Sequence, residues 1–303
     1  MHLGVVVVSY NTRNLLRACL ASVEAEAGRL GVECEIVVVD NGSTDGSCEL
    51  VQESFGDVHL IRPADNVGYA GAVNIALVRW LGLPECPPRV LVLNPDTELR
   101  RGALTELLIA AELPAVALVG PSLEYADGRF QHAAFREPGV VQVVLDVFPV
   151  PRLTDSTLNG RYGRNLYYDV PFDADFVLGA CMLVNMDAVT QVGPMDSGFF
   201  MYCEEMEWCM RFRRAGWRVL CAPAARVMHH AGAATSQSRP EMWVSLWRSR
   251  LRFFRIAGPA WRSTLLRATV ATVLRLRALS GGAGAPPGAT ADERMSAVRR
   301  VLA

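Results

Sequence analysis

Short apolar runs alternate with longer amphipathic stretches along the N-terminal part of the chain. The apolar runs lie within residues 3–9, 35–40, 58–61, 89–93 and 116–119. Runs this short and this continuous are typical of strands that are buried on both faces of a parallel sheet. The stretches between them have helical spacing and lie at about residues 12–29, 45–55, 70–82 and 102–112. The alternation predicts an α/β fold, in which helices cover both faces of a mostly parallel sheet.

The rhythm changes after residue 120. Residues 121–172 are rich in Gly, Pro and polar side chains, which predicts loops with short elements. Regular spacing returns with a strand over 176–184, a helix over 203–215 and a strand over 219–221. Residues 241–280 have helical spacing, and the remainder, 281–303, begins with a Gly- and Pro-rich stretch typical of a flexible linker, followed by a short terminal helix.

Charge is distributed unevenly along the 303 residues. Residues 1–240 hold 19 arginines and 28 acidic residues, a net charge of −9, whereas residues 241–279 hold eight arginines and one glutamate, a net charge of +7. The acidic body would repel a phosphate backbone, so nucleic acid is not expected as a partner. The chain contains no lysine, which excludes P-loop chemistry and every mechanism that needs a lysine.

The basic segment predicts amphipathic helices. Trp243, Trp247, Leu251 and Phe254 recur at helical spacing and form one apolar stripe beside arginines. A second apolar set is Leu266, Val270, Val273 and Leu274. Aromatic residues at the edge of a basic face suit the headgroup boundary of an anionic bilayer, so we predict peripheral binding to the inner face of the plasma membrane. The alternative is that these helices pack on the acidic body or form a homodimer contact.

Composition narrows the class of protein. Half of the residues (51%) are hydrophobic, which is enough for a packed core and excludes a disordered chain. We expect neither a transmembrane anchor nor a secretory signal, since no run approaches 18 uncharged apolar residues and no basic leader precedes the first strand. The eight cysteines are scattered without a CxxC spacing, which indicates reduced thiols in a cytoplasmic protein and makes a zinc site improbable.

Polar residues follow the first two predicted strands. The first strand ends in Ser9-Tyr10-Asn11, and the second runs into Asp40-Asn41-Gly42-Ser43-Thr44-Asp45. Ligands bind beyond the carboxyl ends of the strands in an open parallel sheet, so these loops predict a nucleotide pocket, in which Asp40 accepts from a base or ribose donor. The alternative is a simple turn followed by a helix N-cap. No G-x-G-x-x-G follows the first strand, which disfavours a dinucleotide fold.

The fourth strand opens into Asn94-Pro95-Asp96-Thr97. A carboxylate at a strand end is well placed to hold Mg²⁺ or Mn²⁺, which take few protein ligands and complete their shell with substrate phosphates. The same four residues are also a common turn sequence. His229-His230 closes a later strand, and an imidazole can join a carboxylate on Mn²⁺.

Three carboxylates, Glu204, Glu205 and Glu207, stand within four residues at a predicted helix start. Acidic residues there favour the helix dipole, and Glu207 is spaced for an ion pair with Arg211. These structural explanations account for Glu207 well, for Glu204 partly and for Glu205 least. We therefore take Glu205 as the candidate general base.

Taken together, six motifs appear in order over residues 5–236: VVVVSYN, EIVVVDNGSTDGS, DNVGYAGAVN, LVLNPDTEL, GACMLVNMDAVTQVGPMDSGFFMYCEEMEWCMRFRRAGW and VMHHAGAATS. The chain resembles family 2 glycosyltransferases with the GT-A fold, close to the bacterial rhamnosyltransferase-like members that build cell-surface polysaccharides. The resemblance implies a metal-dependent, inverting transfer of a hexosyl-type sugar from a nucleotide-diphospho-sugar, with rhamnose as one candidate. Residues 1–240 would be the catalytic domain, its donor half about 1–120 and its acceptor half about 121–240.

The resemblance also assigns residues. Glu205 takes the position of the base, beside Glu204, and Asp96 and His229 fall on the metal-contacting positions. The nucleotide-sugar positions are Ser9, Tyr10, Asn11, Asp40, Asn41, Ser43, Asp45, Asn66, Gly68, Tyr69, Asn74, Asn94, Asp96, Gly179 and Ala180. The chain departs from the family pattern at 205 and 207, where Glu replaces Asp, and at Trp208, where Leu is usual.

The resemblance implies two kinds of partner, and two rival functions remain. The partners are a dTDP-, UDP- or GDP-linked donor and a glycan or polyprenyl-linked acceptor. A sugar-phosphate nucleotidyltransferase has a related sheet but usually carries a basic glycine-rich loop and catalytic lysines, which this chain lacks. A catalytically weak, glycosyltransferase-like scaffold is the non-enzymatic alternative, which the Glu at position 205 keeps open.

Overall fold

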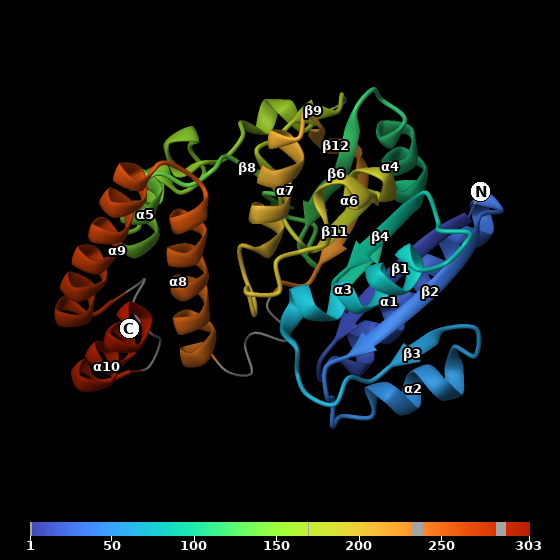
Figure 1. The fold of residues 1–303 in the computed structure, drawn as a ribbon, viewed down its shortest axis with the longest axis horizontal. Helices are drawn as coiled ribbons and strands as arrows, with labels where there is room; N and C mark the ends of the chain where they lie inside the picture. The colour runs from blue at the N-terminus through green and yellow to red at the C-terminus, as the bar shows by residue number, and fades with distance from the viewer. Residues whose placement is uncertain (1, 169, 232–238, 283–288) are drawn as a thin grey trace.

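A ten-stranded sheet forms the centre of the protein (Figure 1). The computed structural model describes residues 2–168, 170–231, 239–282 and 289–303. The strand order is β3-β2-β1-β4-β11-β6-β12-β5, with β7 beside β6 and β9 beside β12. The strands are β1 (His2–Ser9), β2 (Glu33–Asp40), β3 (His59–Ile61), β4 (Arg89–Leu93), β5 (Thr97–Leu99), β6 (Val116–Glu124), β7 (Phe130–Gln131), β9 (Phe172–Asp173), β11 (Cys181–Asn185) and β12 (Arg218–His229).

The first half of the sheet is parallel, as the sequence predicts. Strands β3, β2, β1 and β4 pair in parallel, so their carboxyl ends lie at one edge. Strand β11 then runs antiparallel between β4 and β6, and β12 is parallel to β6. Continuous apolar runs form these strands because both faces are covered. Val5 and Val7 share a core cluster with α1, whereas Val6 and Val8 share one with α3.

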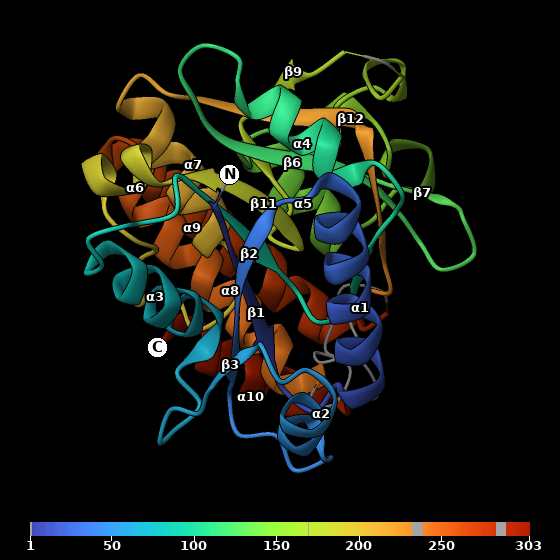
Figure 2. The same cartoon turned by 90° about the vertical axis from the view of Figure 1, so that its right-hand side faces the viewer.

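Helices cover both faces of the sheet (Figure 2). One core cluster contains side chains of α1 (Arg13–Leu30), α2 (Ser47–Ser54) and α4 (Ala103–Ala111). The other contains side chains of α3 (Gly68–Leu81), α6 (Met186–Val192) and α7 (Glu204–Arg214). The predicted fold class is therefore confirmed.

The region after β6 holds more regular structure than the sequence predicts. Within residues 121–172 lie α5 (Val140–Val147) and three short 3-10 helices, at Pro151–Leu153, Thr157–Asn159 and Arg164–Leu166. The strand predicted over 176–184 is instead divided into β10 (Phe176–Val177), which pairs with β8 (Ala134–Phe135), and β11. Residues 178–180 separate them. The division matters because it leaves Gly179 and Ala180 outside the strands.

Three C-terminal helices form a lobe beside the sheet: α8 (Arg239–Ile256), α9 (Ala260–Ser280) and α10 (Ala291–Leu302) (Figure 1). Among the described residues, no helix is both long enough and apolar enough to span a bilayer. Residues 283–288 of the predicted linker lie outside the described residues, and the predicted terminal helix is α10.

The two apolar sets predicted to meet a bilayer face inward instead. Trp247 and Phe254 are each only 2% exposed, and Trp243 and Leu251 are half-buried. Leu266, Val270, Val273 and Leu274 of α9 are also buried, in the same core cluster as α3 and α7. The prediction was wrong for these residues because helix periodicity identifies an apolar face without saying what covers it. The alternative, packing on the body, is confirmed by the ion pairs Arg250–Asp146 and Arg252–Asp196.

Candidate active site

The two predicted nucleotide loops lie side by side. Parallel pairing places Ser9 opposite Asp40, and the Asn41 amide donates to the Ser9 carbonyl at 2.8 Å. The Ser43 hydroxyl donates to Asp40 Oδ2 at 2.6 Å and also accepts from the Asn11 amide at 2.8 Å. The Ser9 hydroxyl is buried and has no hydrogen-bond partner among the described residues. An unpartnered buried hydroxyl at this edge is a group that a bound ligand would satisfy.

Several predicted contacts in these loops are used within the protein. Asp40 accepts from the backbone amides of Gly42 and Ser43, as an Asx turn does. Asp45 accepts from the amides of Arg13 and Ser47, at the starts of α1 and α2. Tyr10 is exposed beside them. The turn alternative is thus correct for the backbone of the loop, and these hydrogen bonds fix the shape of the loop.

Gly68 joins the second loop to the start of α3. The Asn41 side chain donates to the Gly68 carbonyl and accepts from the Val67 amide, while Asn66 Oδ1 accepts from the Gly68 amide. Gly68 has a φ of +73°, and a Cβ there would lie 2.2 Å from the Phe200 carbonyl oxygen. Only glycine combines that conformation with so close a backbone approach.

Asp96 and His229 meet at the ends of β4 and β12. Asp96 Oδ1 lies 3.4 Å from His229 Nε2, and both side chains are buried. The other ring nitrogen, Nδ1, lies 3.2 Å from Gln131 Oε1 of β7. Metal-binding histidines are usually oriented by such a second partner. No third His, Cys, Asp or Glu completes a cluster within the described ranges. Asp and His are residue types that can hold Mg²⁺ or Mn²⁺, cations that take their remaining ligands from substrate phosphates.

Glu205 lies against the loop between β10 and β11. A Cβ at Gly179 would sit 3.5–3.7 Å from the side-chain carbons of Glu205, so these two residues are in contact. The Tyr69 hydroxyl donates to the Gly179 carbonyl at 2.7 Å. The Ala180 carbonyl accepts from the Asn94 amide at 2.9 Å, next to the metal candidate. The structure thus brings α3, the Gly179 loop, the end of β4 and the start of α7 to one place.

Burial changes the acidity of this cluster. It raises the pKa of Glu205 to about 7 and, together with the adjacent charge of Glu205, raises the pKa of Glu204 well above its usual range. Burial, followed by the charges of Glu204, Glu205 and Asp96, also raises the pKa of Tyr69. Oε2 of both glutamates is buried without a hydrogen-bond partner among the described residues. A carboxyl that titrates near pH 7 and has a free oxygen is suited to accept a proton from a substrate.

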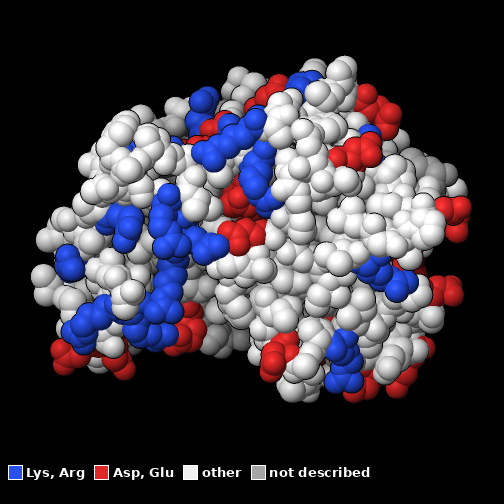
Figure 3. Space-filling view, viewed as in Figure 1, with Lys and Arg blue, Asp and Glu red and all other residues white. Residues whose placement is uncertain are grey.

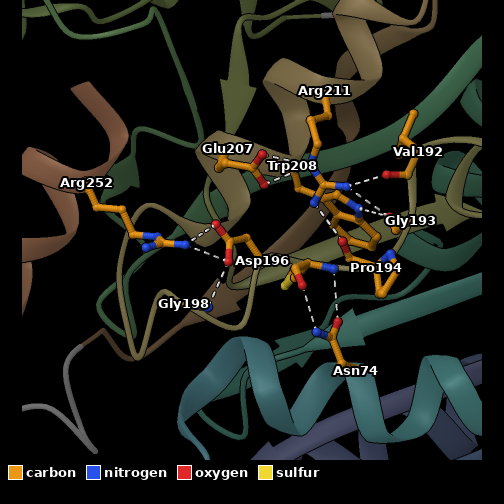
Figure 4. A network of polar contacts seen from close by, with 11 residues as sticks. Asn74, Val192, Gly193, Pro194, Asp196, Gly198, Glu207, Trp208, Arg211 and Arg252 are labelled. Carbon is orange, nitrogen blue, oxygen red and sulfur yellow. Dashed lines mark hydrogen bonds and ion pairs between the residues drawn. The ribbon is translucent and has the colours of Figure 1, made fainter. Parts of the chain in front are cut away.

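Glu207 has a structural role, as its spacing predicts. Its carboxylate receives two hydrogen bonds from Arg211, whose other nitrogens donate to the carbonyls of Val192, Gly193 and Pro194 (Figure 4). Trp208 is fully buried and donates to the Gly193 carbonyl, which explains a large side chain with a donor at this position.

Asn74 belongs to the same network. Its amide group forms two hydrogen bonds with the backbone of Met195, one as donor and one as acceptor (Figure 4). This predicted nucleotide-sugar residue of α3 therefore binds the segment that leads to α7, and its contribution is to position that segment.

Sequence reasoning missed Gln131 and Phe200. Gln131 orients His229 across 98 residues of sequence, and Phe200 offers its carbonyl to the amide of Tyr69. No local sequence pattern marks either residue as functional. Gln131 follows an irregular stretch, and Phe200 makes its contact through its backbone carbonyl.

Comparison with known proteins agrees with this geometry. The model of the family described as glycosyl transferase family 2 matches residues 4–193, so the chain belongs to that family. N-acetylglucosaminyl-diphospho-decaprenol L-rhamnosyltransferase of Mycobacterium tuberculosis is 28% identical, over 91% of each chain. Rhamnosyltransferase WbbL of Escherichia coli is 24% identical over 75% of this chain and 83% of its own.

The fold is the GT-A fold. The mannosyltransferase PcManGT of Pyrobaculum calidifontis, solved in complex with GDP-Man and Mn²⁺, superposes with a TM-score of 0.57. The alignment covers 92% of this chain and 76% of that one at 17% identity.

Proposed function

We propose that this glycosyltransferase moves a sugar, with rhamnose as the first candidate, from a nucleotide-diphospho-sugar to a hydroxyl of a lipid-linked glycan, with inversion. The observation that carries the proposal is the half-buried Glu205 side chain beside Gly179, whose Oε2 atom is buried without a hydrogen-bond partner among the described residues. The Gly179–Ala180 loop connects it, through the hydrogen bond from the Asn94 amide, to the strand end that carries the Asp96–His229 pair. A single base and a separate charge-neutralising site are what a single displacement requires.

In the proposed reaction, the Glu205 carboxylate accepts the proton of the acceptor hydroxyl. The acceptor oxygen then bonds to the anomeric carbon as the bond to the diphosphate oxygen breaks, and the electron pair leaves with the diphosphate. No second carboxylate needs to act as a nucleophile, in contrast to a retaining hydrolase. Glu204 is buried next to the base, and its own pKa is raised by burial and by the charge of Glu205.

Asp96 and His229 would hold Mg²⁺ or Mn²⁺. When bound, the cation neutralises negative charge that develops on the leaving diphosphate. Gln131 fixes the ring of His229. The hydrogen bond from the Asn94 backbone amide to the Ala180 carbonyl fixes the loop that would lie beside the donor sugar. Ser9, Asn11, Asn41 and Ser43 line the nucleotide side, where the Ser9 hydroxyl is free to donate or accept.

The donor and acceptor classes are inferred from relatives. Two relatives carry rhamnosyltransferase names, and the mycobacterial name specifies a diphospho-decaprenol acceptor. We propose a donor linked to dTDP, UDP or GDP, and an acceptor on a polyprenyl diphosphate, used at the cytoplasmic face of the membrane. A nucleotidyltransferase would usually need catalytic lysines, which this chain does not contain. The Oε2 atom of Glu205, which has no hydrogen-bond partner among the described residues, favours a catalytic role over a scaffold role.

Two matched variants test the proposal at different steps. Glu205→Gln keeps the shape of the site, so we expect nucleotide-sugar binding in a thermal-shift panel to persist while transfer falls by about 10²–10⁴-fold. Asp96→Asn should instead lose the part of the thermal shift that depends on Mn²⁺. The exposed Glu53→Gln and Asp57→Asn serve as controls.

The contrast between the variants decides the outcome. A full Mn²⁺-dependent shift in Asp96→Asn would remove Asp96 from the metal site. Unchanged transfer in Glu205→Gln, or loss of transfer only in Glu204→Gln, would move the base elsewhere. No transfer and no donor hydrolysis by the unaltered chain with any nucleotide-sugar would favour the scaffold.

A further inference from the structure

Helix α9 presents an apolar face to solvent that periodicity alone does not single out. Trp261, Leu265, Leu276 and Leu279 are 69%, 49%, 52% and 72% exposed. With the exposed Ala268 and Thr272 between them, they recur at spacings of four and three residues along the helix. Residues at these spacings share one side of an α-helix, so the exposed side chains form a continuous stripe, the α9 outer stripe.

This stripe is separate from the face that α9 buries. Leu266, Val270, Val273 and Leu274 pack inward with α8 and α5. Helix α9 therefore has two apolar faces, of which only this one packs against the rest of the described chain. On α5, which packs against α9, Val140, Val141 and Val144 are also exposed. Several large apolar side chains exposed together indicate a surface that contacts something else.

The charge of the lobe indicates which kind of partner the stripe contacts. Residues 260–280 hold four arginines and no acidic residue. Of these, Arg267 and Arg275 are exposed, and neither forms an ion pair within the described parts of the chain. A cavity of about 240 Å³ between α8, α9 and α10 is lined by Arg248, Arg252, Arg255 and Arg267. Figure 3 shows the arginine side chains gathered over this lobe.

A second copy of the chain fits this surface poorly. Two α9 outer stripes in contact would bring two arginine-bearing helices together, and α9 has no acidic side chain to pair with them. Like charges facing each other destabilise such an interface. An apolar stripe that has the exposed Arg275 at its edge, on a lobe with more arginines than acidic residues, is instead complementary to a surface with anionic groups above an apolar layer.

We propose that the α9 outer stripe is the surface by which the protein binds an anionic phospholipid bilayer. This inference rests on the proposed function only in that a lipid-linked acceptor places the enzyme at a membrane. Trp261 and the three leucines enter the boundary between headgroups and acyl chains, and the exposed Arg267 and Arg275 of α9 contact lipid phosphates. Helix α8, whose stripe is buried, connects this surface to the body.

Vesicle sedimentation with the full-length chain tests the surface. The probe is a set of vesicles of phosphatidylcholine with or without phosphatidylglycerol. We expect the unaltered chain to sediment with the anionic vesicles and to be released by high salt. Trp261→Ser with Leu279→Ser should lower the partition constant more than tenfold, since each loses exposed apolar area only. The matched control is Val78→Ser with Ile109→Ser, which removes two apolar side chains that are also more than half exposed, from α3 and α4.

Point variants are used because cutting the chain after α7 and β12 would expose the buried side chains of α8. Equal sedimentation of the stripe variant and the control, or no binding by the unaltered chain, overturns the proposal. So does light scattering that shows a dimer without lipid, if the stripe variant is a monomer. Transfer to a water-soluble acceptor is measured in parallel: it reports on the proposed function alone and should be unchanged in the stripe variant.

Discussion

At the scale of single residues, the proposed site depends on two adjacent carboxyl groups, one of them buried (Glu204) and the other half-buried (Glu205). Glu204 and Glu205 begin α7, where the helix dipole favours negative charge, yet burial outweighs that effect and raises the pKa of both. Replacing Asp by Glu at 205 lengthens the side chain, and the contact with Gly179, which has no side chain, gives the extra methylene room.

The raised pKa values predict how stability depends on pH. The folded protein keeps protons that the unfolded chain releases near pH 4.5, so their contribution to the free energy of unfolding is complete below that pH. It is lost as pH rises through about 7. Glu204→Gln removes a carboxyl that stays protonated in the interior while the unfolded chain releases its proton. We therefore expect the variant to be more stable than the unaltered chain at pH 8, with a smaller difference at pH 5.

Urea unfolding at the two pH values measures this difference. Glu53→Gln, an exposed replacement in α2, shows what a change of net charge does by itself. A gain in Glu204→Gln that is the same at pH 5 and pH 8 would contradict the assignment of burial as the cause.

At the scale of elements, the segment between α6 and α7 is fixed from three sides. Arg211 holds the carbonyls at its start, Asn74 of α3 holds Met195, and Arg252 of α8 holds Asp196, which in turn accepts from the Gly198 amide (Figure 4). The segment continues to Phe200, against Gly68, and then to the base. Its path therefore determines where Glu205 stands.

Gly68→Ala tests that path. A positive φ costs a non-glycine residue roughly 1–2 kcal/mol, and the clash with the Phe200 carbonyl adds about 1–3 kcal/mol of overpacking. Gly128→Ala is the matched control, because Gly128 has a φ of +80° with open space where the Cβ would be. We expect Gly68→Ala to lose more unfolding free energy than the control and also to lose transfer activity. Equal losses in the two variants would show that Phe200 adapts freely.

Some of the elements could be predicted from the sequence, whereas contacts between distant elements could not. Strands β1, β2 and β4 and the loops after them follow from short apolar runs, because those runs are largely buried on both faces. The approach of Gln131 to His229 does not follow, since it joins a two-residue strand to a distant strand end. In α9 the residues on both sides are apolar, so periodicity could not tell the packed side from the exposed one.

At the scale of the whole molecule, the helical lobe is connected to the catalytic body by charge as well as by packing. Arg252 forms two hydrogen bonds with Asp196 and lies 5.1 Å from the centre of the Phe199 ring. Asp196 and Phe199 belong to the segment that leads to Glu205. The lobe therefore contributes to the position of the base as well as covering the core.

We predict that Arg252→Met lowers kcat while the KM for the donor changes little, because the nucleotide loops lie on other elements. Arg300→Met, which breaks the exposed pair with Glu241 on the same lobe, is the control and should leave kcat unchanged. In a double-mutant cycle with Asp196→Asn, coupling of about 0.5–3 kcal/mol is expected. Additive effects on kcat would remove the pair from the positioning of the base.

The antiparallel strand β11 has a consequence for how such enzymes diversify. It pairs with β4, the last strand of the parallel run β3-β2-β1-β4, and with β6 on its other side, so one five-residue strand joins the two parts of the sheet. A chimera that exchanged donor preference between two enzymes would succeed only if it carried a β11 whose register matches β4. The recombination boundary then falls at residues 178–180, beside Glu205, where a small shift in register would separate the proposed donor-sugar loop from the proposed base.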